Sequence, residues 1–312
     1  MAPMRPPTQP PMRYLVTGAT GFIGRHLVRH LTEGGHDVTA LVREGRHAPG
    51  AAHCLPGDLA TGNGLLNAVQ EAAPDRVIHL AGLTKAAHAH AYDEINEHGT
   101  RMLCSALAAL PRPPRLVLCS SLAASGPGRL RHEDDPPAPV SAYGRSKLGG
   151  ECAVGDRGTV VRPPIVYGPG DREFLPRLVA SVRAGLLPVV GGPGPRRYSL
   201  IHVDDLCRAL LTAAECGADG AVHHVCDGTE HLWDDIGAAV ATALGRRPPR
   251  VVRVPVWAAR GAARVFGRGT TLTPDKVAEA LHPDWTAAPG RLPFTAQITL
   301  ADGLRSALAP RP

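Results

Sequence analysis

Short apolar runs alternate with longer stretches of helical periodicity along the first two thirds of the chain. Residues 13–17 form an apolar run, and "FIGRHLVRHLTEGG" follows with apolar positions at helical spacing before a Gly-Gly stop. Strand patterns recur in "HDVTALV", "RVIHLAG", "PRLVLCSS" and "TVVRPPIV", with helical stretches between them. Strands that alternate with helices predict parallel β-α-β units, and therefore an α/β fold with a doubly wound parallel sheet.

The pattern becomes irregular after Val166, where one helix is mixed with Gly/Pro-rich loops. It resumes at "IHVDDLCRALLTAAECG" and "AVHHVCD", and "DDIGAAVATALG" then starts a region of helices joined by Pro-rich loops. We therefore expect a large domain of residues 12–165 plus 196–226 and a smaller lobe of residues 166–195 plus 227–312. Residues 1–11 are expected to be a disordered leader, because they combine prolines and arginines without an apolar core.

Composition indicates which partners and which cellular compartment to expect, but it does not indicate the reaction. The formal net charge is +6, but the arginines are dispersed and no nucleic-acid motif accompanies them, so we expect no nucleic-acid partner. Seven cysteines without a C-x-x-C pair predict a reducing compartment, and we expect a cytoplasmic protein. No run of about 18 apolar residues occurs, so no membrane partner is expected. Residues 251–266 are interpreted as a cap helix over a pocket, with a membrane-surface helix as the alternative.

Three glycines at the first strand-to-helix turn, Gly18, Gly21 and Gly24, indicate a phosphate-binding turn. Backbone N–H groups and the positive end of the helix dipole meet there, so a pyrophosphate would be stabilised. A plain tight turn is the alternative interpretation. After the next strand, where an NAD-binding unit has an acidic residue about 20 residues on, this chain has Val42 and Arg43. A guanidinium pairs with a 2′-phosphate, so Arg43 predicts NADP, with NAD as the alternative.

Two further strand ends carry candidate cofactor residues. Asp58 and Leu59 follow the third short strand, where a carboxylate can accept from an adenine amino group; a helix N-cap is the competing role for Asp58. Leu80, Ala81 and Gly82 end the fourth strand, and their small size leaves room for a ligand at the carboxyl edge of the sheet. Small residues also suit close helix packing.

The segment "PVSAYGRSKLGGE" suggests the chemistry. Tyr143 and Lys147 are four residues apart and share one face of a helix. A free phenol has a pKa of about 10, and a nearby ammonium favours the phenolate. Upstream, Ser120 and Ser121 stand at a strand end, where a hydroxyl can hold a carbonyl oxygen. Serine, tyrosine and lysine together predict a hydride-transfer site in which serine orients the oxygen, tyrosine passes the proton and lysine tunes tyrosine.

From Tyr14 onward the chain resembles the extended short-chain dehydrogenase/reductase family, the NAD(P)-dependent epimerase/dehydratase superfamily. The resemblance rests on "TGATGFIG", "GDL", "HLAG", "NEHGT", "SSLAASG", Tyr143-x-x-x-Lys147, "RPPIVYGPGD" and "IHVDDL". It implies a Rossmann dinucleotide-binding domain and a substrate lobe, with Ser121, Tyr143 and Lys147 catalytic. It also implies that Asn96 ties a helix to the sheet and that Pro164 lies beside the nicotinamide. The expected cofactor-binding residues are Gly18, Gly21, Phe22, Ile23, Gly24, Arg43, Asp58, Leu59, Leu80, Ala81, Gly82, Tyr143, Lys147 and Pro164.

Departures from the family pattern narrow the substrate. The Asp-Glu pair that follows the catalytic hydroxyl in 4,6-dehydratases is replaced by Leu122 and Ala123, so the resemblance implies no elimination chemistry. The position of the diphosphate-gripping arginine of nucleotide-sugar epimerases is Tyr198, with Arg197 one residue off. The pattern "RRYSLIHVDDL" is most similar to the sterol and dihydroflavonol-type reductases, which favours an apolar alcohol or ketone.

We therefore expect an NAD(P)-dependent oxidoreductase that interconverts a secondary alcohol and a ketone on a small, largely apolar substrate. A nucleotide-sugar epimerase with tightly held cofactor is the alternative enzyme, and a non-catalytic dinucleotide-binding regulatory protein is the alternative from another class. By the same resemblance, the helix after Asn96 and the Tyr143 helix predict a homodimer through a four-helix bundle. No metal site is expected, because His88 and His90 lack a third ligand.

Overall fold

The computed structural model describes residues 10–86, 88–266 and 273–309. Seven parallel strands form the main sheet, in the order β12-β7-β5-β4-β1-β2-β3. The doubly wound parallel sheet predicted from the sequence is therefore confirmed. Apart from residues 10 and 11, the expected leader lies outside the described residues. The strands are β1 (Arg13–Thr17), β2 (Asp37–Val42), β3 (His53–Pro56), β4 (Arg76–His79), β5 (Arg115–Cys119), β7 (Gly158–Arg162) and β12 (Val222–His224).

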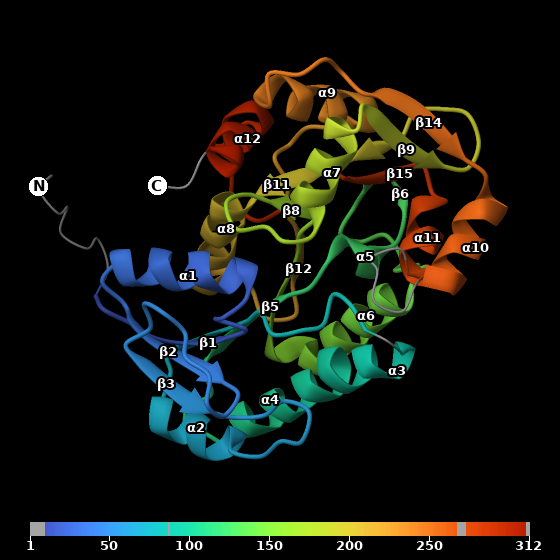
Figure 1. The fold of residues 1–312 in the computed structure, drawn as a ribbon. Helices are drawn as coiled ribbons and strands as arrows, with labels where there is room; N and C mark the ends of the chain where they lie inside the picture. The colour runs from blue at the N-terminus through green and yellow to red at the C-terminus, as the bar shows by residue number, and fades with distance from the viewer. Residues whose placement is uncertain (1–9, 87, 267–272, 310–312) are drawn as a thin grey trace, which may run out of the picture.

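Helices cover both faces of this sheet (Figure 1). On one face, α1 (Phe22–Glu33) and α8 (Val203–Cys216) pack an apolar cluster that includes Leu27, Leu31 and Leu210. On the other face lie α2 (Leu65–Ala72), α4 (Gly99–Ala108) and α6 (Ala142–Val154), with a second cluster over the same strands. Because strands that are buried on both faces carry apolar side chains throughout, they appear as nearly continuous apolar runs in the sequence.

The sheet order reverses between β1 and β4. From β1 the chain extends the sheet through β2 and β3, and it then returns to place β4, β5 and β7 on the other side of β1. The crevice at the carboxyl ends of the strands beside such a reversal is the usual ligand site of an open α/β sheet. Three short elements follow β4 and β5 at this edge: α3 (Ala89–Tyr92), the π-helix Asp93–His98 and α5 (Leu122–Ser125). The 3₁₀ turn Gly155–Arg157 instead leads into the amino end of β7.

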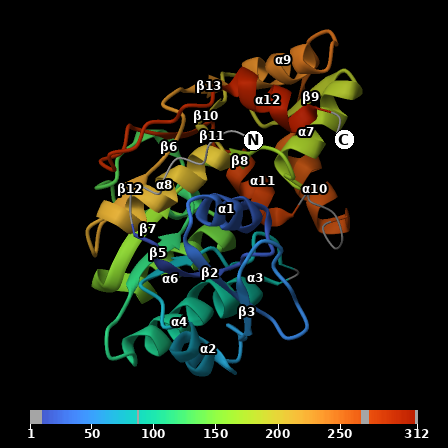
Figure 2. The same ribbon diagram turned by 90° about the vertical axis from the view of Figure 1, so that its left-hand side faces the viewer.

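The remaining segments build a smaller layer above that edge. In Figures 1 and 2 the helices α9 and α12 lie on the opposite side of the molecule from α2 and α4. The strands here form a four-stranded sheet in the order β13-β10-β15-β6 and two pairs, β11 with β8 and β14 with β9. The elements are β6 (Gly128–Arg131), β8 (Ile165–Tyr167), α7 (Phe174–Arg183), β9 (Leu186–Val190), β10 (Arg197–Tyr198), β11 (Leu200–His202), β13 (His231–Leu232), α9 (Trp233–Ala243), β14 (Arg250–Val254), α10 (Val256–Phe266), α11 (Pro274–Ala280), β15 (Asp284–Ala287) and α12 (Leu300–Leu308).

Two features of this layer differ from the sequence expectation. The segment predicted as one cap helix from residue 251 begins instead as strand β14, which pairs with β9, and only α10 is helical. The strand β6 falls inside the range assigned to the large domain, yet it pairs with β15 of the smaller layer. The division into 12–165 plus 196–226 and 166–195 plus 227–312 stays a prediction.

Candidate active site

The glycine-rich turn after β1 leaves no room for side chains. Gly18 has φ of +70°, and a Cβ there would lie 2.7 Å from the backbone nitrogen of Ala81. A Cβ on Gly24 would collide with the carbonyl oxygen of Gly18. Gly18 therefore lies directly against the end of β4, and the amino end of α1, whose first N–H groups have no partner within the helix, lies over Gly18. This cradle fits the pyrophosphate of a dinucleotide.

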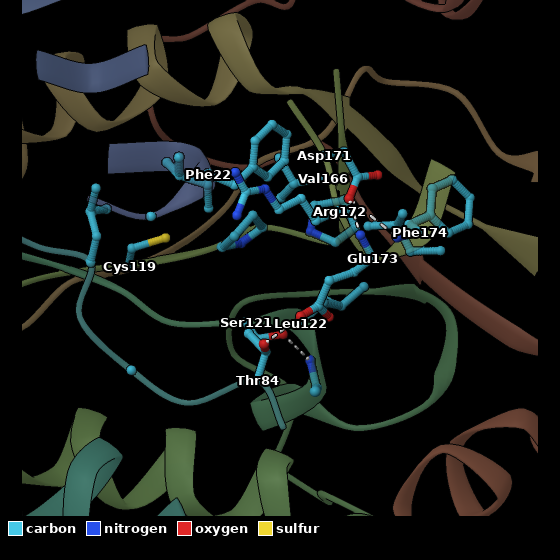
Figure 3. A pocket seen from close by; sticks show the side chains of 18 of the residues that line it. Phe22, Thr84, Cys119, Ser121, Leu122, Val166, Asp171, Arg172, Glu173 and Phe174 are labelled. Atoms are coloured by element: carbon cyan, nitrogen blue, oxygen red, sulfur yellow. Dashed lines mark hydrogen bonds between the residues drawn. The ribbon is translucent and has the colours of Figure 1, made fainter. Parts of the chain in front are cut away.

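A cavity of about 950 Å³ opens at this edge of the sheet. It extends from the glycine turn past α5 and α6 to the aromatic side chains of the smaller layer. Figure 3 shows part of it, with Phe22 and Cys119 on one side and Phe174 on the other. Of the residues predicted from the sequence, those that line the cavity are Gly18, Gly21, Phe22, Ile23, Gly24, Leu80, Gly82, Ser121, Tyr143 and Pro164.

Five predicted residues lie outside this lining. Lys147 is buried behind it, and the backbone nitrogen of Ala81 donates to Thr17 Oγ1 at 3.1 Å. Asp58 closes a local turn by accepting from the backbone nitrogen of Ala60 at 2.8 Å, so it is not the N-cap of α2, which is Gly64. Leu59 packs against α4. Arg43 is exposed at the end of β2.

Tyr143 stands in the first turn of α6 and faces the cavity. The helix begins where Ser141 Oγ accepts from the backbone nitrogen of Gly144 at 3.0 Å. Burial raises the pKa of Tyr143 well above its ordinary value, while a hydrogen bond with the Ser121 side chain works in the opposite direction. The phenol is therefore protonated at neutral pH. The ring of Tyr92 packs edge-on against it, with centroids 5.9 Å apart.

The two serines after β5 have separate roles. Ser120 donates to the buried carboxylate of Glu151, which is also paired with Arg162 at 2.6 Å. Ser121 instead caps α5 by accepting from the backbone nitrogen of Ala123 at 3.1 Å, and its hydroxyl interacts with Tyr143. Of the two candidates, Ser121 is therefore the one whose hydroxyl is placed beside the phenol.

Lys147 lies one helical turn beyond Tyr143 and is 7% exposed. Its Nζ donates to the carbonyl oxygen of Cys119 at 2.8 Å, and burial lowers the pKa of Lys147. Burial also lowers the pKa of His79 to about 3, with Lys147 adding to the effect. His79 is therefore neutral, and its ring is held by Thr17 Oγ1 at 2.5 Å and Thr100 Oγ1 at 3.0 Å.

Asn96 holds the loop after β4 against α6. Its side chain exchanges hydrogen bonds with the backbone of Leu83, at 2.7 Å and 3.0 Å, and donates to Ser146 Oγ at 2.9 Å. Gly82 approaches so closely that a Cβ there would lie 2.9 Å from Asn96 Oδ1 and 3.7 Å from Lys147 Nζ. The loop and the helix are thereby fixed to one another beside the cavity.

Sequence reasoning missed a contact made by helix α11. Both oxygens of Asp275 accept backbone hydrogen bonds at the start of α6, from Ala142 at 3.1 Å and Tyr143 at 3.2 Å. Lys276 Nζ lies 5.6 Å from the centroid of the Tyr143 ring and is paired with Glu279 at 2.8 Å. Asp275 is more than 130 residues from Ala142 and Tyr143 in the sequence, so no local spacing signals the contact.

A second missed contact joins the two rims of the cavity. Glu173, just before α7, accepts from Thr84 Oγ1 at 3.1 Å and pairs with Lys85 at 3.1 Å. Figure 3 shows Glu173 reaching from its loop toward Thr84, close to Ser121. Asp171 organises this loop by accepting from the backbone nitrogens of Glu173, at 2.7 Å, and of two following residues.

Arg196 and Arg197 precede Tyr198, the position at which nucleotide-sugar epimerases have a diphosphate-gripping arginine, and both bind other groups of the protein. Arg197 is paired with Asp284 at 3.1 Å, and Arg196 donates to the carbonyl oxygens of Val190, Ala280 and Leu281. Within residues 10–86, 88–266 and 273–309, no group of three or more His, Cys, Asp or Glu residues is arranged to hold a metal ion. No helix in that part of the chain is long and apolar enough to cross a membrane.

Comparison with known proteins places this geometry among dinucleotide-dependent enzymes. The model of the NAD dependent epimerase/dehydratase family matches residues 14–226. The ceramide reductase of Caulobacter vibrioides is 33% identical, over 92% of this chain and 90% of the relative. A 3-diazoavenalumate denitrifying reductase of a Streptomyces species is 31% identical, over 90% of this chain and all of the relative.

Among solved structures, MoeE5 in complex with UDP-glucose and NAD superposes with a TM-score of 0.72 at 28% identity, over 94% of this chain and 96% of that one. A putative epimerase from Burkholderia cenocepacia gives a TM-score of 0.73 at 27% identity, over 96% of this chain and 97% of that one. The cradle at Gly18 and the cavity beyond it are therefore found in a chain whose relatives include reductases and a protein seen with NAD.

Proposed function

The chain belongs to the NAD-dependent epimerase/dehydratase family and is an NAD(P)-dependent enzyme, and we propose that it reduces the ketone of a small, largely apolar substrate to a secondary alcohol. The observation that carries this proposal is the buried, protonated phenol of Tyr143, which faces the cavity beside Ser121 and one turn before Lys147. A neutral phenol is the protonation state that a ketone reduction requires.

Different residues at the carboxyl edge of the sheet bind the cofactor, orient the carbonyl oxygen and donate the proton. The backbone around Gly18, Gly21 and Gly24 would hold the dinucleotide through its pyrophosphate, and the reduced nicotinamide supplies a hydride when bound. Ser121 orients the carbonyl oxygen, and Tyr143 donates the proton to it. Lys147 carries a positive charge that stabilises the phenolate left behind, and its buried ammonium reaches toward the strand ends where the ribose would lie.

The substrate end of the cavity favours a molecule with a large apolar part. It is lined by Phe174, Tyr198, Trp233 and Trp285. In the family alternative, a nucleotide-sugar epimerase, the arginine that grips the diphosphate stands at the position that is Tyr198 here, and the neighbouring Arg197 is paired with Asp284. The names of relatives favour ketone reduction over epimerisation, because several are ketoreductases. One of them is a 4-farnesyl-dihydroquinoline-oxide ketoreductase of Stigmatella aurantiaca. The similarity to MoeE5, seen with UDP-glucose, keeps the epimerase as the second candidate.

We further propose that NADP(H) is preferred. Arg43 follows β2 directly and is exposed, so its guanidinium is available to a 2′-phosphate, and no carboxylate replaces it at that position.

The expected homodimer also stays a proposal, supported by the position of α4 and α6 side by side on one face of the sheet (Figure 1). Light scattering distinguishes a 32.7 kDa monomer from a dimer of twice that mass. All seven cysteines are free, which fits a cytoplasmic location.

Oxidation of NADPH in the presence of a panel of apolar ketones tests the proposed function. Consumption of NADPH with formation of the secondary alcohol supports it, and an unchanged NADPH absorbance with every ketone, despite tight cofactor binding, would favour a non-catalytic regulatory protein. Interconversion of UDP-sugars without net consumption of cofactor would favour the epimerase instead.

A further inference from the structure

Arg177 carries a charge that the rest of the described chain does not compensate. It lies in the first half of α7 and lines the cavity. Its Nη2 is buried and has no hydrogen-bond partner within residues 10–86, 88–266 and 273–309. A buried charged donor without an acceptor is costly and is rare in folded proteins. The unpaired guanidinium therefore suggests an acceptor that is not part of the chain.

The carboxylates around the cavity are already engaged elsewhere. Asp171 accepts three backbone hydrogen bonds at the start of α7. Glu173 is paired with Lys85 across the rim at 3.1 Å, and Glu279 is paired with Lys276 at 2.8 Å. Since each of these acids has a partner of its own, the positive charge of Arg177 faces the cavity without a matching anion from the part of the chain that the structure describes.

Aromatic side chains line the same cavity as Arg177. Phe174 precedes Arg177 by three residues and therefore shares its face of α7. The ring centroid of Phe174 lies 6.3 Å from that of Trp233, which is itself 5.4 Å from Tyr198. All three rings line the same cavity as Tyr143. The lining thus combines an apolar wall with a cation whose Nη2 is buried.

We propose that Arg177 binds an acidic group, a carboxylate or a phosphate, at the end of the substrate that is remote from the reacting ketone, while the apolar body of the substrate lies along Phe174, Trp233 and Tyr198. This inference rests on the proposed function, because it names the class of ketone that the site takes. Arg172, on the loop before α7, also lines this cavity, but its side chain extends toward Phe22, on the side away from Phe174 (Figure 3).

Calorimetric binding to the NADP⁺-loaded protein tests the subsite without relying on turnover. The probes are hexanoate, octanoate and decanoate, their methyl esters, and octyl phosphate. We expect at least one acid to bind tenfold or more tightly than its ester, because the ester keeps the apolar body but lacks the charge. Comparison of octanoate with octyl phosphate distinguishes the two sources of the anion.

Arg177→Gln should weaken binding of that acid at least tenfold and change binding of its ester less than twofold. Arg183→Gln is the matched control, because Arg183 lies on the same helix but does not line the cavity; both affinities should stay within twofold. Unchanged affinity of Arg177→Gln for NADP⁺ separates a substrate subsite from a contact with the cofactor. Equal binding of acids and esters by the wild type, or a preference that survives in Arg177→Gln, would overturn the proposal.

Turnover separates this inference from the proposed function. Oxo acids from 4-oxopentanoate to 7-oxooctanoate are compared with their methyl esters by kcat/KM. Reduction of the acids in preference, lost in Arg177→Gln, supports both proposals. Equal reduction of acids and esters would overturn the subsite and leave the reductase in place. Preferential binding of acids without reduction of any ketone would overturn the reductase and leave the subsite in place.

Discussion

The two ends of the cavity are built from different kinds of contact. At the nucleotide end, backbone meets backbone: Gly18 presses against Ala81, and Gly24 lies over the carbonyl oxygen of Gly18. At the substrate end, side chains from α7, α9 and α11 line the cavity that Tyr143 faces. In the first arrangement, the contact of Gly24 with Gly18 depends on spacing within ten residues of chain, and the contact of Gly18 with Ala81 depends on the pairing of the neighbouring strands β1 and β4. The second arrangement depends on contacts between segments of different layers. The nucleotide end is therefore specified by the glycine spacing and the main sheet, and the substrate end is specified by the packing of the smaller layer.

Tyr143 joins the two ends. Its helix packs on the main sheet, but the first backbone N–H groups of that helix donate to Asp275 from the smaller layer. The comparison therefore predicts that changes at Tyr143 affect chemistry alone, changes at the glycines affect cofactor binding and folding together, and changes at Asp275 affect the docking of the smaller layer.

Tyr143→Phe should have the largest effect. The substitution keeps the ring and removes the proton donor, so we expect kcat to fall about 10²–10⁴-fold while the dissociation constant for NADPH changes less than twofold. Steady-state kinetics and a fluorescence titration of NADPH measure the two quantities. Tyr92→Phe, which removes the hydroxyl of the ring packed against Tyr143, is the control and should leave kcat within a few fold. Full activity of Tyr143→Phe would disprove the site.

Gly18→Ala should damage the nucleotide end in both folding and binding. A Cβ at Gly18 meets the backbone at 2.7 Å, so we expect a loss of about 3 kcal/mol or more of unfolding free energy and a hundredfold weaker binding of NADPH. Gly45→Ala is the control, because Gly45 has the same φ of +70° with nothing within 4 Å of the added Cβ. Its cost should be only about 1 kcal/mol. Equal losses in urea denaturation would show that the close approach is unimportant.

Arg43→Ala should remove most of the preference for NADP(H). A charge-assisted bidentate pair with a 2′-phosphate contributes about 1.5–3 kcal/mol, which corresponds to a tenfold to hundredfold preference. Adding Val42→Asp should reverse the preference, because the carboxylate accepts from the 2′-hydroxyl of NAD and repels the phosphate. The test is the ratio of kcat/KM with NADPH to kcat/KM with NADH, measured in the wild type and in the two variants. Equal values in the wild type would contradict the role of Arg43 and leave the fold unaffected.

Asp275→Asn should have the smallest effect. It weakens two hydrogen bonds to the amino end of α6 and removes a charge that the helix dipole favours, so we expect a loss of about 1 kcal/mol in unfolding free energy with NADPH affinity unchanged. Asp302→Asn, in the exposed first turn of α12, is the control and should cost a few tenths of a kcal/mol. Equal stability of the two variants would argue against a special role of Asp275.

The difference between the nucleotide end and the substrate end of the cavity also explains how much of the molecule could be predicted from its sequence. The parallel sheet and the glycine turn follow from apolar periodicity and from a motif contained within one β-α unit. Tyr143 and Lys147 are four residues apart on one helix, so their shared face is also local information. The structure adds that Ser120 is taken up by Glu151, which only the position of α6 across from β5 reveals.

The substrate end could not be predicted in this way. Asp275 and Lys276 reach Tyr143 from more than 130 residues away, and the role proposed for Arg177 depends on the absence of a hydrogen-bond partner for its Nη2 among the residues that the structure describes. The strand β14 was hidden because "RVVRV" leads straight into a helix with the same mixture of apolar residues and arginines. Short strands of this layer, such as the two-residue β10 and β13, carry too little periodicity to be recognised.

The dependence of both reaction directions on pH tests the central claim, that the buried phenol of Tyr143 is the proton donor. Conversion of a ketone to an alcohol consumes a proton, so the ratio of reduction to oxidation kcat/KM must change tenfold per pH unit under any mechanism. Burial raises the pKa of Tyr143, so the donor stays protonated from pH 6 to 9. The account predicts that kcat/KM for the best ketone is constant over this range while oxidation of its alcohol rises tenfold per unit. A reduction rate that falls tenfold per unit while oxidation stays constant would contradict it.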